Sequence, residues 1–339
     1  MKKIVLCLFS SFCFAQSYSV INQEKIGVNL RGLSFESEDT FVVSGSNNTI
    51  GITNNGGKSF KWISPSVVNG KDFRDIEIIS ENSFFALSIG SPANIIYTND
   101  GGVNWSVVYE NTDPEVFLSS LYFDQKNDII YAIGTKYGTT KPVVLISNTS
   151  NPTLWTATST LHNQPTRLKN SNEIMVASSG GNLYADENQV LVVTGGESSV
   201  LYRYTPSGGR TYTIPKTVSQ TSGANAITFD PAYNVGYFVG GDFMIPSSSD
   251  HNIFKFKLKD DKIEILDMWN FPKGYKSGVT IVDEETVVVC GSSGVEYTKD
   301  GGFNWREVTS ESYNTCLVAP DLSTVILVGN NGKIGKLTF

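Results

Sequence analysis

The feature that most constrains this chain is a series of short apolar runs that each end in glycine. Seven such runs occur along its 339 residues, and their glycines are 45, 44, 61, 45, 51 and 38 residues apart. The glycines are Gly45, Gly90, Gly134, Gly195, Gly240, Gly291 and Gly329. A period in this range is typical of β-propellers, whose repeating unit is a four-stranded antiparallel blade.

A second segment, with apolar residues at alternate positions, precedes each of these glycines. Alternation of this kind indicates a strand with one buried face. The segments are residues 31–35, 74–78, 119–123, 181–185, 225–229, 277–281 and 314–318. We therefore predict an all-β fold, a seven-bladed β-propeller of four-stranded antiparallel blades. In each blade this segment would be the innermost strand, and the glycine would end the second strand.

The seventh unit reaches the end of the sequence at Phe339 before it has a fourth strand. Residues 18–26, which precede the first unit, alternate between apolar and polar side chains. Pairing them with the last strand would close the ring and remove an exposed sheet edge. We expect residues 16–339 to form this single domain.

A conspicuous motif, here called the box, follows the glycine in several units. Residues 97–105 read YTNDGGVNW, and residues 297–305 read YTKDGGFNW. The two glycines permit positive φ, and the aspartate can accept hydrogen bonds from backbone N–H groups across a turn. We therefore interpret each box as a hairpin between the third and fourth strands, with its aromatic residue packed on the sheet. The residues assigned to this structural role are Asn55, Asp100, Trp105, Asp300 and Trp305.

The box and its weaker copies resemble the Asp-box, or BNR, repeat. The strand, glycine and box units together resemble the photosystem II stability/assembly factor-like propellers over essentially the whole chain after residue 15. That resemblance implies an exported seven-bladed protein, and many bacterial relatives live in organisms without photosynthesis. Asp-boxes also occur in sialidases, other glycan hydrolases, sorting receptors and reaction-centre chaperones, so the motif identifies a fold rather than an activity.

The first residues have the pattern of a cleaved export signal. Lys2 and Lys3 precede an apolar run over residues 4–14, and Ala15 follows it. The run is too short to span a bilayer, and no later segment is apolar enough to do so. We therefore expect residues 1–15 to be a signal peptide and the protein to be periplasmic or secreted. Removing the two lysines moves the formal charge from −7 to −9, and an acidic protein lacks the basic surface that nucleic acid requires.

Cysteine and histidine chemistry is sparse. Cys290 and Cys316 remain after the signal, and we expect small buried residues, with a disulfide between them left open. His162 and His251 lie in polar loops. No cysteine cluster and no glycine-rich phosphate loop before a helix is present, so we expect no metal and no cofactor.

The candidate ligand site rests on two arginines. Arg31 and Arg74 occupy the same register, at the start of the innermost strand in neighbouring blades, where a propeller's channel opens. Beside Asp75 and Glu77, they could bind an anionic group such as a sugar carboxylate or an acidic side chain. In the alternative interpretation, they bridge adjacent blades through local carboxylates. The full candidate set at this mouth is Arg31, Arg74, Asp75, Glu77, Asn225 and Asn314.

A sialidase needs three arginines around one carboxylate, but this chain has six in total and two at this register. We therefore expect a monomeric binding or assembly scaffold without catalysis, whose partner is a protein or glycan of the cell envelope. The alternative is a glycan-acting hydrolase of sialidase-like build. Two long insertions, residues 159–181 and 240–252, could carry specificity, the second through Phe243 and Met244.

Overall fold

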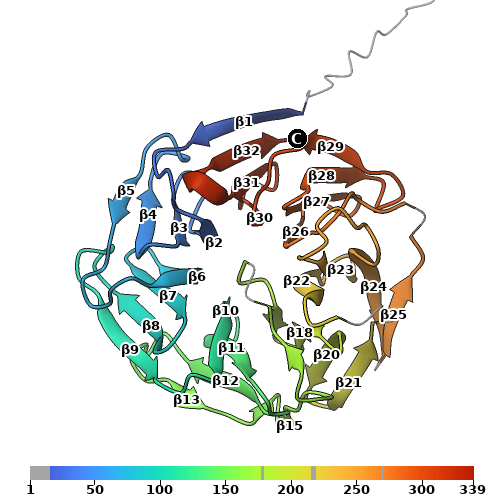
Figure 1. Ribbon diagram of the computed structural model, residues 1–339, viewed down its shortest axis with the longest axis horizontal. Coiled ribbons are helices and arrows are strands. Elements are labelled where there is room, and N and C mark those ends of the chain that lie inside the picture. The colour runs from blue at the N-terminus through green and yellow to red at the C-terminus, as the bar shows by residue number, and fades with distance from the viewer. Residues whose placement is uncertain (1–15, 177–178, 215–218, 261, 269) are drawn as a thin grey trace, which may run out of the picture.

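The computed structural model describes residues 16–176, 179–214, 219–260, 262–268 and 270–339. The predicted signal peptide, residues 1–15, lies outside the described residues. The described part of the chain forms seven antiparallel blades arranged as a closed ring (Figure 1). It contains β-strands and one short 3₁₀ helix, Asn330–Gly332, but no α-helix. The predicted all-β, seven-bladed propeller is therefore confirmed.

Each blade has four main strands, which run outward from the channel. The first three blades are β2 (Leu30–Phe35), β3 (Phe41–Gly45), β4 (Thr49–Thr53) and β5 (Lys61–Ile63); β6 (Asp72–Ser80), β7 (Ser83–Ile89), β8 (Ala93–Thr98) and β9 (Ser106–Asn111); and β10 (Val116–Asp124), β11 (Ile129–Lys136), β12 (Pro142–Ser147) and β13 (Thr156–Ala157). The next three are β17 (Leu183–Asp186), β18 (Gln189–Val193), β20 (Val200–Thr205) and β21 (Gly208–Thr213); β22 (Ser222–Asp230), β23 (Val235–Asp242), β24 (Ile253–Lys259) and β25 (Lys262–Leu266); and β26 (Gly278–Ile281), β27 (Thr286–Gly291), β28 (Gly294–Lys299) and β29 (Arg306–Thr309).

The seventh blade joins the two ends of the described chain. It consists of β30 (Thr315–Val318), β31 (Thr324–Val328), β32 (Ile334–Thr338) and the N-terminal strand β1 (Ser17–Asn22). β1 pairs antiparallel with β32, as the top of Figure 1 shows. The hydroxyl groups of Tyr18 and Tyr313 lie 2.8 Å apart within this blade. The ring is therefore closed by the N-terminal strand, as the sequence predicts.

The core consists of apolar layers between neighbouring blades. Phe85 and Leu87 of the second blade, for example, pack against Leu118 and Leu121 of the third. Such layers explain the repeat, because each blade needs a neighbour to cover both of its faces. A further layer, between the sixth and seventh blades, contains Cys290 of β27 and Cys316 of β30 as buried free thiols.

The fourth blade departs from the predicted pattern. Gly195 does not end the second strand there, because β18 ends at Val193. Instead Gly195 and Gly196 form β19, which pairs with β16 (Glu173–Ile174) and with β22 of the next blade. The insertion of residues 159–181 supplies β16 and the hairpin of β14 (Thr160–Leu161) and β15 (Gln164–Pro165). Its last residues then turn toward the centre of the ring, which accounts for the long spacing.

Candidate functional site

Bulges in the innermost strands set the direction of the polar side chains near the channel. In several of these strands the antiparallel register shifts by one residue at the same relative position. A β-bulge of this kind leaves one residue out of the ladder and redirects its side chain. The residues at these bulges are Arg31 in β2, Arg74 in β6, Ser119 in β10 and Asn225 in β22.

The two arginines share one small hollow at the start of the innermost strands, here called the arginine hollow. Its volume is about 40 Å³. Two guanidinium groups and one carboxylate, that of Asp72, are among its lining residues, so the lining is positively charged. The lining residues are Asn29, Arg31, Ser46, Asp72, Phe73 and Arg74.

Burial disfavours the charged forms of both arginines, and repulsion by Arg74 adds to this effect at Arg31. Burial is the main cause that lowers the pKa of Arg31 to about 10; Arg74 lowers it further, while Tyr275 and Asp72 oppose the shift. Burial also lowers the pKa of Arg74. With a pKa of about 10, Arg31 remains charged at neutral pH. The Nε atom of Arg74 is buried and has no hydrogen-bond partner among the described residues. An incoming oxygen anion would satisfy that donor and relieve the repulsion.

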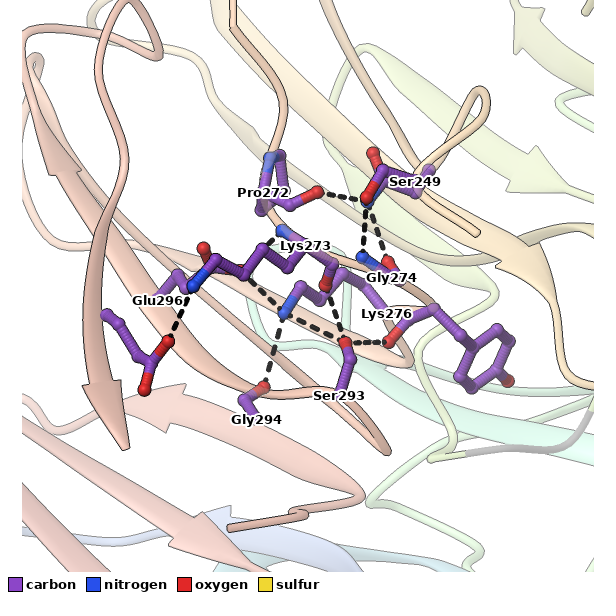
Figure 2. A network of polar contacts seen from close by, with 11 residues as sticks. Ser249, Pro272, Lys273, Gly274, Lys276, Ser293, Gly294 and Glu296 are labelled. Carbon is purple, nitrogen blue, oxygen red and sulfur yellow. Dashed lines mark hydrogen bonds and ion pairs between the residues drawn. The ribbon is translucent and has the colours of Figure 1, made fainter. Parts of the chain in front are cut away.

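A buried ion pair holds Tyr275 at this mouth (Figure 2). The Nζ atom of Lys276 lies 2.9 Å from Oε2 of Glu296, and both side chains are almost wholly buried. The same Nζ donates to the Oγ atom of Ser293 at 3.2 Å and to the carbonyl of Gly294 at 3.3 Å. Ser293 in turn donates to the carbonyl of Tyr275 at 2.9 Å. This network fixes the segment that leads into β26.

The second insertion, residues 240–252, is bonded to the same segment. The Nδ2 atom of Asn252 donates to the carbonyl of Pro272 at 2.6 Å, and the backbone N–H of Gly274 donates to Oγ of Ser249 at 2.8 Å (Figure 2). The loop is therefore held in place at its base. Its exposed apolar residues are Phe243, Met244 and Ile245.

Residues 179–181, here called the plug, cross the channel next to the arginine hollow. Oγ of Ser179 donates to the carbonyl of Ser277 at 2.6 Å, and Oγ1 of Thr315 donates to the carbonyl of Ser179 at 3.2 Å. Gly180 has φ of +70°, and a Cβ atom there would lie 2.2 Å from Cγ of Asp75. The plug therefore contacts the second, sixth and seventh blades at once.

Asp75 and Glu77 line a different, larger hollow, here called the carboxylate hollow, whose lining also includes the plug. It shares no lining residue with the arginine hollow. The expectation that these acids lie beside Arg31 and Arg74 at one mouth therefore needs correction. The reason is the bulge at Arg74. Because of it, the Arg74 side chain points in a different direction from the side chains of the regularly paired residues that follow in β6.

Both acids also hold neighbouring blades together. Oδ2 of Asp75 accepts from the backbone N–H of Leu121 at 2.7 Å, and Oε2 of Glu77 accepts from Oγ of Ser34 at 3.0 Å. Burial raises the pKa of Asp75 to about 8 despite its two backbone hydrogen bonds. Burial, and then the proximity of Asp75, raise the pKa of Glu77 well above its usual value.

The two asparagines of the candidate set lie between blades. Nδ2 of Asn225 donates to the carbonyl of Lys276 at 3.5 Å, a long contact that joins the fifth blade to the sixth. Nδ2 of Asn314 donates to the carbonyl of Leu30 at 2.8 Å and joins the seventh blade to the first. Their amide groups are thus engaged in holding the ring together.

The boxes form hairpins between the third and fourth strands, as predicted. Oδ1 of Asp100 accepts from Oγ1 of Thr98 at 2.8 Å and from the backbone N–H of Asn104 at 2.9 Å. Asp300 makes the equivalent bonds in the sixth blade. Trp105 and Trp305 pack against the apolar layers of their blades.

In the first blade Asn55 takes the place of the box aspartate. Its Oδ1 accepts from Oγ1 of Thr53 and from the backbone N–H of Ser59, each at 3.0 Å. All five box residues therefore lie in blade hairpins, and none of them lines either channel hollow.

Sequence patterns did not reveal Tyr275, the Lys276–Glu296 pair or the plug. Only the unusual length of the insertion over residues 159–181 marked the plug in advance. In the part of the chain that the structure describes, no group of three or more His, Cys, Asp or Glu residues is placed to hold a metal. No helix in that part is long and apolar enough to cross a bilayer.

No protein-family model and no curated protein matches this chain. Solved structures do match it. One, described as YCF48 bound to D1 peptide, aligns with a TM-score of 0.65 and 12% identity over 96% of this chain and 97% of that one. Another, YCF48 from Cyanidioschyzon merolae, aligns with a TM-score of 0.64 and 13% identity over 95% and 98%. This chain therefore has a YCF48-like propeller fold.

Proposed function

We propose that this protein is an exported assembly scaffold without catalytic activity, which binds a carboxylate group of a partner protein in the arginine hollow. The observation that carries the proposal is the placement of Arg31 and Arg74 together in one hollow. Their charges repel each other, and Arg74 has a buried Nε donor without a partner among the described residues. A carboxylate supplies the charge and the acceptor oxygens that this pair requires.

The size of the arginine hollow favours a protein partner over a glycan. Pockets that enclose small molecules usually have volumes of about 300–1,000 Å³, whereas this one has about 40 Å³. It can admit the end of an acidic side chain or a C-terminal carboxylate, but it cannot enclose a sugar ring. The hydrolase alternative gains no support, because Asp75 and Glu77 line the other hollow, which shares no lining residue with the arginine hollow.

The solved neighbour adds support of a different kind. YCF48 has been captured with a D1 peptide, so a propeller of this fold can engage a segment of another protein. The export signal predicted for residues 1–15 is the ground for placing this protein, and therefore its partner, in the cell envelope. The proposal makes the exposed Phe243, Met244 and Ile245 a secondary contact for the same partner.

The test uses peptides from the C-termini of envelope proteins, each made once as the free acid and once as the C-terminal amide. We expect wild-type protein to bind the free acids more tightly than the amides. In R31A/R74A the ratio of the two affinities should fall by tenfold or more, since each charged hydrogen bond contributes roughly 1.5–3 kcal/mol. R31K/R74K should restore only part of the affinity, because lysine lacks the planar fork. R306A, which removes an exposed arginine from β29, is the matched control.

Fluorescence anisotropy gives the affinities, and thermal denaturation shows whether each variant is folded. If folded R31A/R74A binds acids and amides as the wild type does, the arginine hollow is not the binding site. If a panel of glycans is cleaved while no peptide binds, the scaffold function is wrong.

A further inference from the structure

The carboxylate hollow is large enough to hold a ligand. Its volume is about 370 Å³, and every innermost strand of the ring contributes to its lining. Residues 179–181, the plug, are also part of its lining. This volume lies within the range of about 300–1,000 Å³ that is usual for small-molecule sites.

The charged groups that line this hollow are all acidic. Asp75 and Glu77 alternate along β6 and therefore face the same way, with Asp75 against the plug and Glu77 nearer the opening. Asp230 lies in the lining at the end of β22. No lysine, arginine or histidine is among the lining residues within the described chain. The surroundings thus oppose an anion and favour a cation.

One wall of the hollow is aromatic. Tyr122, Tyr184 and Phe229 come from the innermost strands of three successive blades and form a continuous series. Their ring centroids are 5.8 Å apart between Tyr122 and Tyr184, and 5.6 Å apart between Tyr184 and Phe229, with edge-to-face geometry. Aromatic rings attract organic cations through their negative faces.

The seventh blade contributes an apolar part of the lining, here called the rim. It consists of Leu317, Val318 and Leu322. Leu322 is 63% exposed, and its φ of +54° is a strained conformation for a bulky side chain. An exposed leucine at the edge of a deep acidic hollow can cover the aliphatic part of a ligand whose charged end lies inside.

We propose that the carboxylate hollow binds an alkylammonium group on an apolar stem, of which a lysine side chain is one source and a free amine the other. The ammonium group lies between Asp75 and Glu77, the stem follows the aromatic wall, and the rim covers the remainder. An ammonium group also favours the ionised forms of the two acids, whose pKa values are raised by burial. A hydrated metal ion does not suit the apolar and aromatic walls.

The binding test compares probes that differ in one group. Nα-acetyl-lysine amide is titrated against Nα-acetyl-norleucine amide, which has a similar stem without the charge, and against hexanoate, which carries the opposite charge. Isothermal titration calorimetry should show millimolar or tighter binding of the lysine derivative, with the norleucine derivative at least tenfold weaker and hexanoate weaker still. Equal binding of lysine and norleucine derivatives, or no binding of any ammonium probe in the millimolar range, overturns the proposal.

Two substitutions locate the site. E77Q keeps an acceptor for Ser34 but removes the charge, so the protein should fold and bind the lysine derivative about fivefold or more weakly. E264Q, on the outermost strand β25, is the matched control and should bind as the wild type does. If E77Q is poorly folded, Y184F and Y184L replace it. Removing the ring should weaken binding, whereas removing only the hydroxyl should not. Unchanged binding by folded E77Q, or by folded Y184L, contradicts the site.

The source of the ammonium group follows from a second pair of probes. If butylammonium binds as tightly as Nα-acetyl-lysine amide, the hollow takes a free amine; if a lysine-containing peptide binds more tightly than both, it takes a side chain of a partner. This proposal does not rest on the arginine hollow. R31A/R74A should leave lysine-derivative binding unchanged, so failure at one hollow is distinguishable from failure at the other.

Discussion

The two hollows of the channel differ in charge although the same strand contributes to both. Arg74 of β6 lines the arginine hollow, and Asp75 and Glu77 of the same strand line the carboxylate hollow. Arg31, with a pKa of about 10, remains charged at neutral pH despite its burial. Burial instead raises the pKa values of the acids, so that they retain protons more readily. A single propeller channel thus presents opposite chemistry at its two ends.

Two local devices create this difference. The bulge at Arg74 turns its side chain away from the regular strand pattern, whereas Asp75 and Glu77 follow that pattern and face the same side of β6. The plug then packs against the acidic side, with Gly180 against the carboxylate of Asp75 where no larger residue fits. At the same level, Gly32 of β2 lets the first blade approach the backbone of Asp75.

The largest predicted effect comes from breaking the ion pair of Lys276 and Glu296, which holds the segment containing Tyr275 near the arginine hollow. K276M leaves Glu296 buried without its positive partner, which should lower the free energy of unfolding by about 3–5 kcal/mol. Urea denaturation measures the change. The folded fraction should keep the carboxylate hollow intact and still bind Nα-acetyl-lysine amide. The double variant K276M/E296L should regain stability, because replacing a buried pair by apolar residues is often neutral. A double variant no more stable than K276M would contradict the role assigned to the pair.

A second substitution tests the contact between Gly180 of the plug and the carboxyl group of Asp75. G180A introduces a methyl group where a Cβ atom would lie 2.2 Å from Cγ of Asp75, in a conformation with φ of +70°. We expect a loss of about 2 kcal/mol or more in unfolding free energy, from backbone strain and displacement of the carboxyl group. Denaturant titration gives the value. G138A, at an exposed turn with φ of +72° and no atom within 4 Å, isolates the strain alone. Equal losses in the two variants would show that the plug does not press on Asp75.

A third prediction concerns the pH dependence of the carboxylate side. The pKa of Asp75 rises from 3.8 to about 8 on folding, so folding is favoured by protonation of this group. Its contribution to stability is fully present below pH 4 and declines as pH rises toward 8. D75N cannot titrate, so the stability difference between wild type and D75N should shrink over this interval. Because the amide satisfies only one of two backbone donors, D75N should be destabilised by about 1–3 kcal/mol at low pH. A constant difference between pH 4 and 8 would argue against the raised pKa.

The smallest predicted effect lies outside the channel and tests whether the hollows are independent of the boxes. Hydrogen bonds from Asn104 lead the causes that lower the pKa of Asp100 to about 2. Its contribution to stability is therefore present above pH 4 and lost as pH falls toward 2. D100A should lower the melting temperature at neutral pH by a few degrees. D100N should lower it less, since Asn55 makes similar bonds in the first blade. Neither should change binding at either hollow; altered ligand binding in D100N would contradict a purely structural role.

Much of the fold was predictable because it repeats. Glycine markers such as Gly45 and Gly291 end second strands, and box residues such as Asp100 and Trp105 lie in hairpins between third and fourth strands. The reading failed at Gly195, where the insertion adds its own strand to the neighbouring blade, and Gly134 and Gly240 lie two residues before the ends of β11 and β23. Repeated local signals are reliable because each blade solves the same packing problem with the same contacts.

The candidate site was predictable only in part. The shared register of Arg31 and Arg74 follows from the repeat and brings them into one hollow. Their separation from Asp75 and Glu77 does not follow, because a one-residue bulge leaves no reliable mark in a single sequence. Nor could Tyr275 be anticipated beside Arg31, since the two are far apart in the chain.

The sequence by itself determined the number of blades, their strand order and the closure of the ring. Blade number and strand order follow from a pattern that repeats from unit to unit, and the closure follows from the one unit that lacks a strand. Tertiary structure alone decided that the acids and the arginines line separate hollows. The plug, the ion pair of Lys276 and Glu296, and the burial that shifts the carboxyl pKa values all depend on contacts between distant blades. Such contacts form only when the ring closes, and no local pattern encodes which side chains then meet.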